Sequence, residues 1–250
     1  MKIYKEPVYD LNELARYNLH VHTTFSSCAK PEMTVEAICK TAEEAGVEMI
    51  ALTDHYNTFD WDDEYMAQIA QLKKEYAALD TKVKVLFSSE LSCYGVGKFV
   101  EKEETAKALD YRLVSCNHFH LDYWGKPEDT SARGYAVFAL ELVKSAMESR
   151  RYDCIAHPLI GRFVKHIEDR TEVSRAMTDN ELGEICELSA KTETALEINV
   201  GAVLGDPALF RRLWNLGREA GATFHFGTDA HRLVNIDTRT HLADIQKIVL

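Results

Sequence analysis

Two histidines separated by one residue are the first side chains along the chain that could do chemistry. The segment YNLHVHTTFSS, residues 17–27, places His20 and His22 on either side of Val21. Alternate side chains of an extended strand lie on the same face, so both imidazoles are expected to point the same way. Two imidazoles on one face can hold a metal ion, although this spacing alone is a weak indication.

Further metal-ligand side chains lie where other apolar segments end. They are Asp54 and His55 in MIALTDH, Glu90 in VKVLFSSEL, His118 and His120 in LVSCNHFH, His157 in CIAHP, and Asp229 and His231 in TFHFGTDAH. One histidine at a strand end is more often structural than a ligand. Histidines and acids at the same end of several strands indicate a metal site. We expect His225 to pack within its strand, and His166 and His241 to be solvated.

The donor types indicate which ions would bind. Imidazole and carboxylate together suit Zn, Fe or Mn. The donors outnumber the four that a tetrahedral ion takes, so two or three divalent ions are expected. A carboxylate such as Glu90 can bridge two of them. Two ions about 3.5–4 Å apart activate a water and clamp the oxygens of an in-line displacement, which points to hydrolysis of a phosphoester.

Strand-like and helix-like segments alternate along the chain and predict how these residues are positioned. The expected strands are Tyr17–His22, Glu48–Thr53, Lys82–Leu91, Tyr111–Cys116, Tyr152–Ala156, Ala195–Val200 and Thr223–Gly227. The expected helices are Thr34–Ala45, Asp62–Leu79, Arg133–Ser149, Asp179–Thr192, Pro207–Ala220 and one after Thr240. This α/β pattern predicts a distorted seven-stranded (β/α) barrel, similar to a TIM barrel, with the metal site at the C-terminal strand ends. An open doubly wound sheet is the alternative.

Two long segments lack regular periodicity. Cys116–Ala132 and Gly161–Met177 are expected to be irregular loops, and loops of that length in a compact barrel are usually lids or binding loops. No linker rich in Pro, Gly or Ser divides the chain, so residues 1–250 are expected to form a single metal-dependent hydrolase domain.

Composition narrows the classes of partner. The net charge of −11 disfavours sequence-independent binding of nucleic acid, and no stretch of apolar residues is long enough for a membrane helix. The first residues lack the apolar core of a signal peptide, so a cytoplasmic location is expected. The six cysteines are scattered, with no CxxC pair, and are expected to be reduced. The expected partner is a small phosphorylated substrate.

The ordered set HxHTxxS, TDH, a lone Glu, a His after a strand, AHP and GTDAH resembles the PHP (polymerase and histidinol phosphatase) superfamily over residues 17–232. The stretches YDCIAHPLIGRF and LEINVGAV are most similar to its histidinol-phosphate phosphatase branch. The resemblance implies a distorted seven-stranded barrel, a trinuclear metal centre and hydrolysis of a phosphomonoester.

The resemblance also implies a ligand set. His20, His22, Glu90 and Asp229 would hold one ion; Glu90, His118 and His157 a second; and His55 and His231 a third. In the histidinol phosphatases a further histidine, eight residues after the first of HxH, joins the third ion. Here that position is Cys28, whose thiolate can ligate zinc. The alternative is an unliganded thiol, with the third site weak or empty.

The expected mechanism uses a metal-activated water that attacks the phosphorus of a monoester. Arg162, on a loop after His157, is a candidate clamp for the phosphate, and a solvated surface arginine is the alternative. Asp229 or His231 could protonate the leaving alkoxide, and Asp54 is expected to orient a neighbouring histidine.

L-Histidinol phosphate is the best single substrate candidate, followed by another small phosphomonoester such as a nucleoside monophosphate. A metal-binding regulatory module without turnover is a second class, motivated by Cys28. A metal-dependent hydrolase of C–N or C–O bonds is a third, disfavoured because no lysine lies at a strand end.

Overall fold

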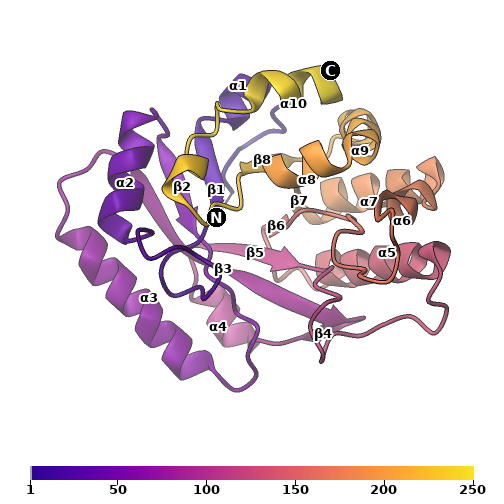
Figure 1. The fold of residues 1–250 in the computed structure, drawn as a ribbon, viewed down its shortest axis with the longest axis horizontal. Coiled ribbons are helices and arrows are strands. Elements are labelled where there is room, and N and C mark those ends of the chain that lie inside the picture. The colour runs from indigo at the N-terminus through magenta and orange to yellow at the C-terminus, as the bar shows by residue number, and fades with distance from the viewer. Residues whose placement is uncertain (1) are drawn as a thin grey trace.

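The computed structural model describes residues 2–250. Its centre is a parallel sheet in the order β1-β2-β3-β5-β6-β7-β8 (Figure 1). The strands are β1 (Tyr17–Val21), β2 (Met49–Leu52), β3 (Lys84–Gly95), β5 (Tyr111–Ser115), β6 (Cys154–Ile155), β7 (Ala195–Asn199) and β8 (Phe224–Gly227). The predicted seven-stranded α/β barrel is confirmed. A further short strand, β4 (Lys98–Phe99), pairs antiparallel with the far end of β3 and was not predicted.

The sheet closes on itself between its first and last strands. The backbone N–H of His22 donates to the carbonyl of Ala230 at 2.9 Å, and the N–H of Ala230 donates to the carbonyl of His20 at 3.2 Å. Below this bridge the side-chain amide of Asn18 donates to the hydroxyl of Thr228 at 2.7 Å. The N–H of Thr228 returns a bond to Asn18 Oδ1 at 3.1 Å. A side chain therefore substitutes for part of the backbone pairing at this seam.

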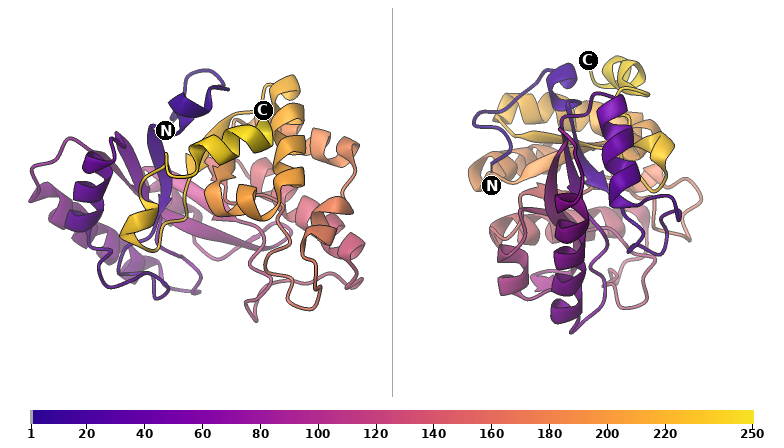
Figure 2. Two further views of the ribbon diagram at one scale, coloured as in Figure 1. Left: turned by 45° about the horizontal axis from the view of Figure 1, so that its top comes forward. Right: turned by 90° about the vertical axis from the view of Figure 1, so that its left-hand side faces the viewer.

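The helices lie outside the sheet (Figure 2). They are α1 (Leu11–Leu14), α2 (Val35–Glu44), α3 (Asp62–Ala77), α4 (Glu103–Lys107), α5 (Ala132–Glu148), α6 (Thr171–Arg175), α7 (Asp179–Thr192), α8 (Val200–Gly205), α9 (Pro207–Ala220) and α10 (Leu242–Val249), with a 3₁₀ turn at Leu233–Asn235. Local chemistry fixes several ends. α7 begins with a reciprocal capping box between Thr178 and Glu181, and α9 ends at Gly221, whose φ is 75°.

The six long helices lie where the sequence predicted them, within one or two residues. The four short ones were not predicted, because fewer than two turns show no measurable periodicity. One of these corrects an expectation directly: α6 lies inside the segment 161–177, which was expected to be irregular throughout.

A small apolar layer fills the barrel beneath the strand ends. It consists of Leu19, Ala51, Leu86, Tyr111, Leu113, Cys154, Ala156 and Ala195, which come from six neighbouring strands or directly follow one. His225 lies against this layer, with Nδ1 3.0 Å from the hydroxyl of Tyr111, as expected for a packed histidine. The polar side chains at the strand ends therefore lie directly above a layer of buried apolar side chains.

Candidate metal centre

A bulge in β1 directs His20 into the barrel. The register between β1 and β2 shifts, so three residue steps from Asn18 to Val21 match two steps from Ile50 to Leu52. The extra residue lets Leu19 pack in the interior layer while His20, its direct neighbour, also faces inward. Bulges that re-aim a side chain are common next to active sites. His20 and His22 then lie on the same side, with ring centres 5.1 Å apart, as the HxH spacing predicted.

Glu90 of β3 is the centre of the cluster. Its Oε1 lies 2.9 Å from His157 Nε2 and 3.5 Å from His118 Nε2. Its Oε2 lies 2.7 Å from His55 Nδ1, and 3.7 Å and 3.8 Å from the Nε2 atoms of His20 and His22. One buried carboxylate therefore faces imidazoles from five places in the sequence, which is the arrangement of a bridging ligand.

Two candidate ligands have unusual backbone conformations. Asp229 follows β8 with a φ of 53°, and His157 follows β6 with a φ of 30°. Few residues other than glycine adopt such angles, and they concentrate at functional sites. Asp229 Oδ1 lies 3.1 Å from His22 Nε2 and 3.4 Å from His20 Nε2. His231 Nδ1 contacts the carbonyl of Asp229 at 2.8 Å.

The ligand atoms fall into four groups, each close enough to share an ion. They are His20, His22 and Glu90; Glu90, His118 and His157; His22, His55 and His231; and His20, His157 and Asp229. Within each group the donor atoms lie within 4.8 Å of one another. In addition, His20 Nε2 is buried and has no hydrogen-bond partner among the described residues, and Glu90 Oε2, 3.7 Å from it, forms an ion-pair contact with His55 but no well-aligned hydrogen bond. Buried polar atoms without partners are costly, and a cation between them would satisfy both. The residues therefore fit divalent metal ions.

Burial controls the protonation of the central histidines. Burial and the neighbouring His55 lower the pKa of His22 to about 3, and burial lowers the pKa of His118 to about 3 although Glu90 opposes it. Both imidazoles are neutral near pH 7, which is the form that ligates metals. Burial raises the pKa of Glu90, but the charge of His55 and the hydrogen bond with His157 outweigh burial and hold this pKa well below its usual range.

Cys28 lies at the exposed edge of the cluster. Burial raises the pKa of its thiol, but hydrogen bonds with His231 and His55 outweigh this effect and bring the pKa to about 6. The thiol therefore faces the two histidines that the family resemblance assigns to the third ion. Its sulfur is not in any of the four close groups, where His22 takes the third position beside His55 and His231. The other five cysteines are buried, and all six are free thiols.

Glu197 belongs to the centre and was not identified from the sequence. This buried acid of β7 lies with Oε1 2.8 Å from His20 Nδ1, and its Oε2 accepts the backbone N–H of His157 at 2.5 Å. Gly227 makes room for it, since a Cβ there would lie 2.2 Å from Glu197 Oε1. The available signal was a lone acid at an inward position of the apolar segment LEINV. Glu197 orients one candidate ligand and fixes the backbone of another.

Asp54 acts on the turn that carries His22. Its carboxylate accepts the N–H of Thr23 at 2.8 Å, the hydroxyl of Thr23 at 2.6 Å and the hydroxyl of Ser26 at 2.6 Å. Ser26 Oγ lies 3.1 Å from His22 Nδ1. Asp54 therefore reaches a histidine through one intervening hydroxyl and not directly.

Arg162 lies on the exposed loop after β6. Its guanidinium carbon lies 5.6 Å from the ring centre of Phe163. The Phe163 ring in turn packs 5.0 Å from His118 and 4.7 Å from His120. His120 is therefore a neighbour of the centre without belonging to a ligand group. His166 is exposed and contacts the carbonyl of Thr130 at 2.8 Å, in keeping with the solvated position expected for it.

The chain belongs to the PHP domain family, whose model matches residues 18–201. The superfamily expected from the metal-ligand motifs is thereby confirmed. Together with the four ligand groups, this membership supports a metal-dependent phosphoesterase.

Two solved structures share the fold over most of both chains. Histidinol phosphate phosphatase from Lactococcus lactis subsp. lactis Il1403, complexed with zinc, L-histidinol and phosphate, is 20% identical with a TM-score of 0.55, and 93% of each chain is covered. A putative histidinol phosphatase from Listeria monocytogenes is 16% identical with a TM-score of 0.66, covering 91% of this chain and 99% of that one. At these identities the likeness shows the fold alone.

A relative found by sequence comparison is a nucleic-acid enzyme and not a histidinol phosphatase. The DNA polymerase/3'-5' exonuclease PolX of Bacillus subtilis (strain 168) is 25% identical over 227 residues, which is 88% of this chain. The chain spans 35% of that relative's length. None of the helices in residues 2–250 combines the length and apolar character needed to cross a membrane.

Proposed function

We propose that residues 1–250 form a single metal-dependent hydrolase domain that cleaves a small phosphomonoester. The observation that carries the proposal is the set of four ligand groups around Glu90 at the C-terminal strand ends. Each group combines imidazole with imidazole or carboxylate donors, the set that suits zinc, iron or manganese. The named residues would hold two or three ions, with Cys28 the proposed additional ligand of the third.

When bound, the ions supply Lewis acidity and a water that is acidic enough to be deprotonated near neutral pH. The chain's own residues prepare the site. Glu90 holds the ligand groups together, Glu197 sets the orientation of His20, and the Asp54–Ser26 pair sets that of His22. The dry layer beneath restricts water to the open face of the barrel, where the phosphoryl group would enter.

The leaving alkoxide needs a proton, and the two candidate acids differ. Burial raises the pKa of Asp229, but His20 and His22 outweigh it and hold this pKa far below its usual range. Asp229 therefore carries no proton to donate. The pKa of His231 is raised, because hydrogen bonding to Cys28 and the charge of Asp229 outweigh burial. His231 is the proposed donor when it does not ligate the third ion.

L-Histidinol phosphate is the first substrate to assay, supported by the fold shared with the two histidinol phosphatases. Another small phosphomonoester, such as a nucleoside monophosphate, is the second. The relationship to PolX favours one further candidate, hydrolysis at the end of a nucleic-acid strand. The net charge of −11 disfavours it, because binding to such a strand is dominated by cationic contacts with phosphates. A cytoplasmic location remains a prediction.

The test combines metal analysis with turnover. The purified wild type and Cys28→Ala are compared by elemental analysis, by phosphate release from L-histidinol phosphate and a nucleoside monophosphate, and by mononucleotide release from a single-stranded oligonucleotide. About three ions in the wild type and about two in the variant would support Cys28 as a ligand. Phosphate release from a monoester, lost with chelator and restored by zinc or manganese, would support the phosphatase. Retention of metal with no release from any phosphoester would instead favour the regulatory module.

A further inference from the structure

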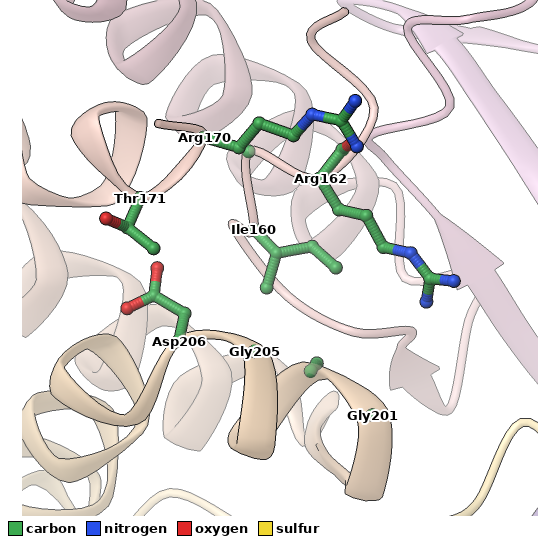
Figure 3. A pocket seen from close by; sticks show the side chains of 9 residues that line it. Ile160, Arg162, Arg170, Thr171, Gly201, Gly205 and Asp206 are labelled. Carbon is green, nitrogen blue, oxygen red and sulfur yellow. The ribbon is translucent and has the colours of Figure 1, made fainter. Parts of the chain in front are cut away.

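A cavity of about 280 Å³ lies between the loop after β6 and helix α8 (Figure 3). One wall begins at Ile160, three residues after His157. The opposite wall begins at Gly201, two residues after Asn199, whose amide donates to Glu197 Oε1 at 3.2 Å. Both walls are therefore continuations of segments that hold the centre, and they leave the same ends of the neighbouring strands β6 and β7.

Close packing of the loop brings two arginines to this cavity. A Cβ on Gly161 would lie 2.2 Å from the carbonyl oxygen of Arg170, so only glycine allows the two segments to cross here. Arg170 Nη1 also donates to the carbonyl of Arg162 at 2.8 Å. These contacts place Arg162 and Arg170, eight residues apart in sequence, in the lining of one cavity, and a Cβ on Gly201 of the opposite wall would lie 4.0 Å from Arg162 Nη1.

The charge of the cavity is opposite to that of the whole chain. Both arginine side chains border it, and within residues 2–250 no carboxylate pairs with either guanidinium. The carboxylate that lines the cavity, Asp206, is already bonded, because it accepts the hydroxyl of Ser174 at 2.5 Å and the N–H of Leu209 at 3.2 Å. Figure 3 shows this carboxylate at the other end of the cavity from the two guanidinium groups.

The remaining walls are apolar and bear little side-chain volume. Ile160 is 5% exposed, and glycine occupies positions 201 and 205 with Ala202 beside them. A Cβ on Gly205 would meet nothing within 4 Å, so the space in front of it is open. Such walls accept an aliphatic or flat body, while the guanidinium groups accept a carboxylate or phosphate.

We propose that this cavity binds the non-reacting part of the substrate, and that this part is a small, largely apolar body that ends in an anionic group. The inference rests on the proposed phosphomonoesterase function and separates its candidate substrates. The amino alcohol of L-histidinol phosphate carries a positive charge, which Arg162 and Arg170 would repel. A phosphorylated hydroxy acid, or an alcohol that carries a second phosphate, matches them.

The test uses two phosphomonoesters that differ in charge. Glycerol 3-phosphate and 3-phosphoglycerate have bodies of similar size, but only the second carries a carboxylate. Phosphate release is measured with the metal-loaded full chain, and binding of each compound is measured by calorimetry, which needs no turnover. The variants are Arg170→Gln, Gly205→Leu to fill the cavity, and two controls outside it, Arg218→Gln and Gly183→Leu, the latter also with open space at its Cβ.

We expect the wild type to prefer 3-phosphoglycerate by about tenfold in kcat/KM and in Kd. Arg170→Gln should reduce this ratio to near one, Gly205→Leu should raise the KM for 3-phosphoglycerate, and the controls should retain the wild-type ratio. Equal use of both compounds in wild type and Arg170→Gln would overturn the inference and leave the phosphatase intact. Arg170-dependent binding without turnover would support the cavity and refute the phosphatase.

Discussion

Replacing Glu197 with glutamine tests whether the buried acid controls the metal centre. The carboxylate accepts from three directions: the backbone N–H of His157, the amide of Asn199 and the Nδ1 side of His20. A glutamine of the same shape has one accepting and one donating end. The N–H of His157 cannot change, so the amide oxygen must take its place opposite that group.

The amide nitrogen then faces His20 and reverses the hydrogen bond there. With Glu197 present, His20 Nδ1 carries the proton and Nε2, which faces Glu90, is free to ligate a cation. With glutamine, Nδ1 becomes the acceptor and the proton moves to Nε2, where it blocks ligation. Outer partners of this kind are typically worth about 10- to 100-fold in metal affinity, or about 1.4–2.8 kcal/mol.

The assay is competition between the protein and a zinc chelator of known affinity. Glu197→Gln should weaken the zinc Kd by 10- to 100-fold, while its far-ultraviolet circular dichroism stays unchanged. Glu187→Gln, an exposed acid on α7, is the matched control and should bind zinc as the wild type does. Glu197→Asp, which retains the charge, should lose less than the glutamine variant. A folded Glu197→Gln with a wild-type Kd would refute the reasoning and reduce Glu197 to a packing residue.

Three further changes test other parts of the structure. Gly227→Ala would place a methyl group against Glu197 and His20, so we expect about 1–3 kcal/mol of destabilisation by urea unfolding, and an unchanged midpoint would contradict the tight approach. In metal-free protein near neutral pH, Cys28, with its pKa of about 6, should be the first cysteine alkylated, and zinc should slow its labelling if it is a ligand; mass spectrometry of the labelled peptides decides both points. The folded-state pKa values of His22 and His118, about 3, lie below the unfolded value of about 6.5. Through these two groups the stability of metal-free protein should fall as the pH drops below about 6.5, by about 1.4 kcal/mol per unit for each histidine, while His55, whose pKa is raised to about 10, offsets part of the loss. Titration of the His22 and His118 imidazoles at about pH 6.5, followed by NMR, would count against buried neutral side chains.

The sequence predicted the parts of the fold that repeat. Seven strands and six long helices were recognisable because alternation and helical periodicity persist over enough residues. The ligand types could also be predicted, because each lies at the end of an apolar run and parallel strands bring those ends to one rim. What could not be predicted are features with no period: the two-residue strand β4, the short helices, and the extra residue in β1.

The assignment of residues to their partners depended on tertiary contacts. Glu197 lies in a segment that looks like any buried strand, and only the approach of β1 and β8 shows that its carboxylate meets His20. The surroundings of Cys28 depend on how the turn after His22 folds back, and Asp54, which follows β2, fixes that turn through hydrogen bonds with Thr23 and Ser26. Similarly, no sequence pattern predicts that Arg162 and Arg170 lie close together, because their proximity results from two loop segments that cross at Gly161.

A metal ion bound at the metal centre would also stabilise the seam between β1 and β8. Val21 and Ala230 form an isolated bridge there, and the candidate ligands His20, His22, Asp229 and His231 flank it on both strands. An ion held by these residues would cross-link positions 207 residues apart, much as a long-range disulfide does. Such a link removes chain entropy from the unfolded state, and its effect grows with the length of the loop that it closes. Metal loss should therefore loosen the molecule first along this seam, and hydrogen exchange at His22 and Ala230 would report the opening before the helices unfold.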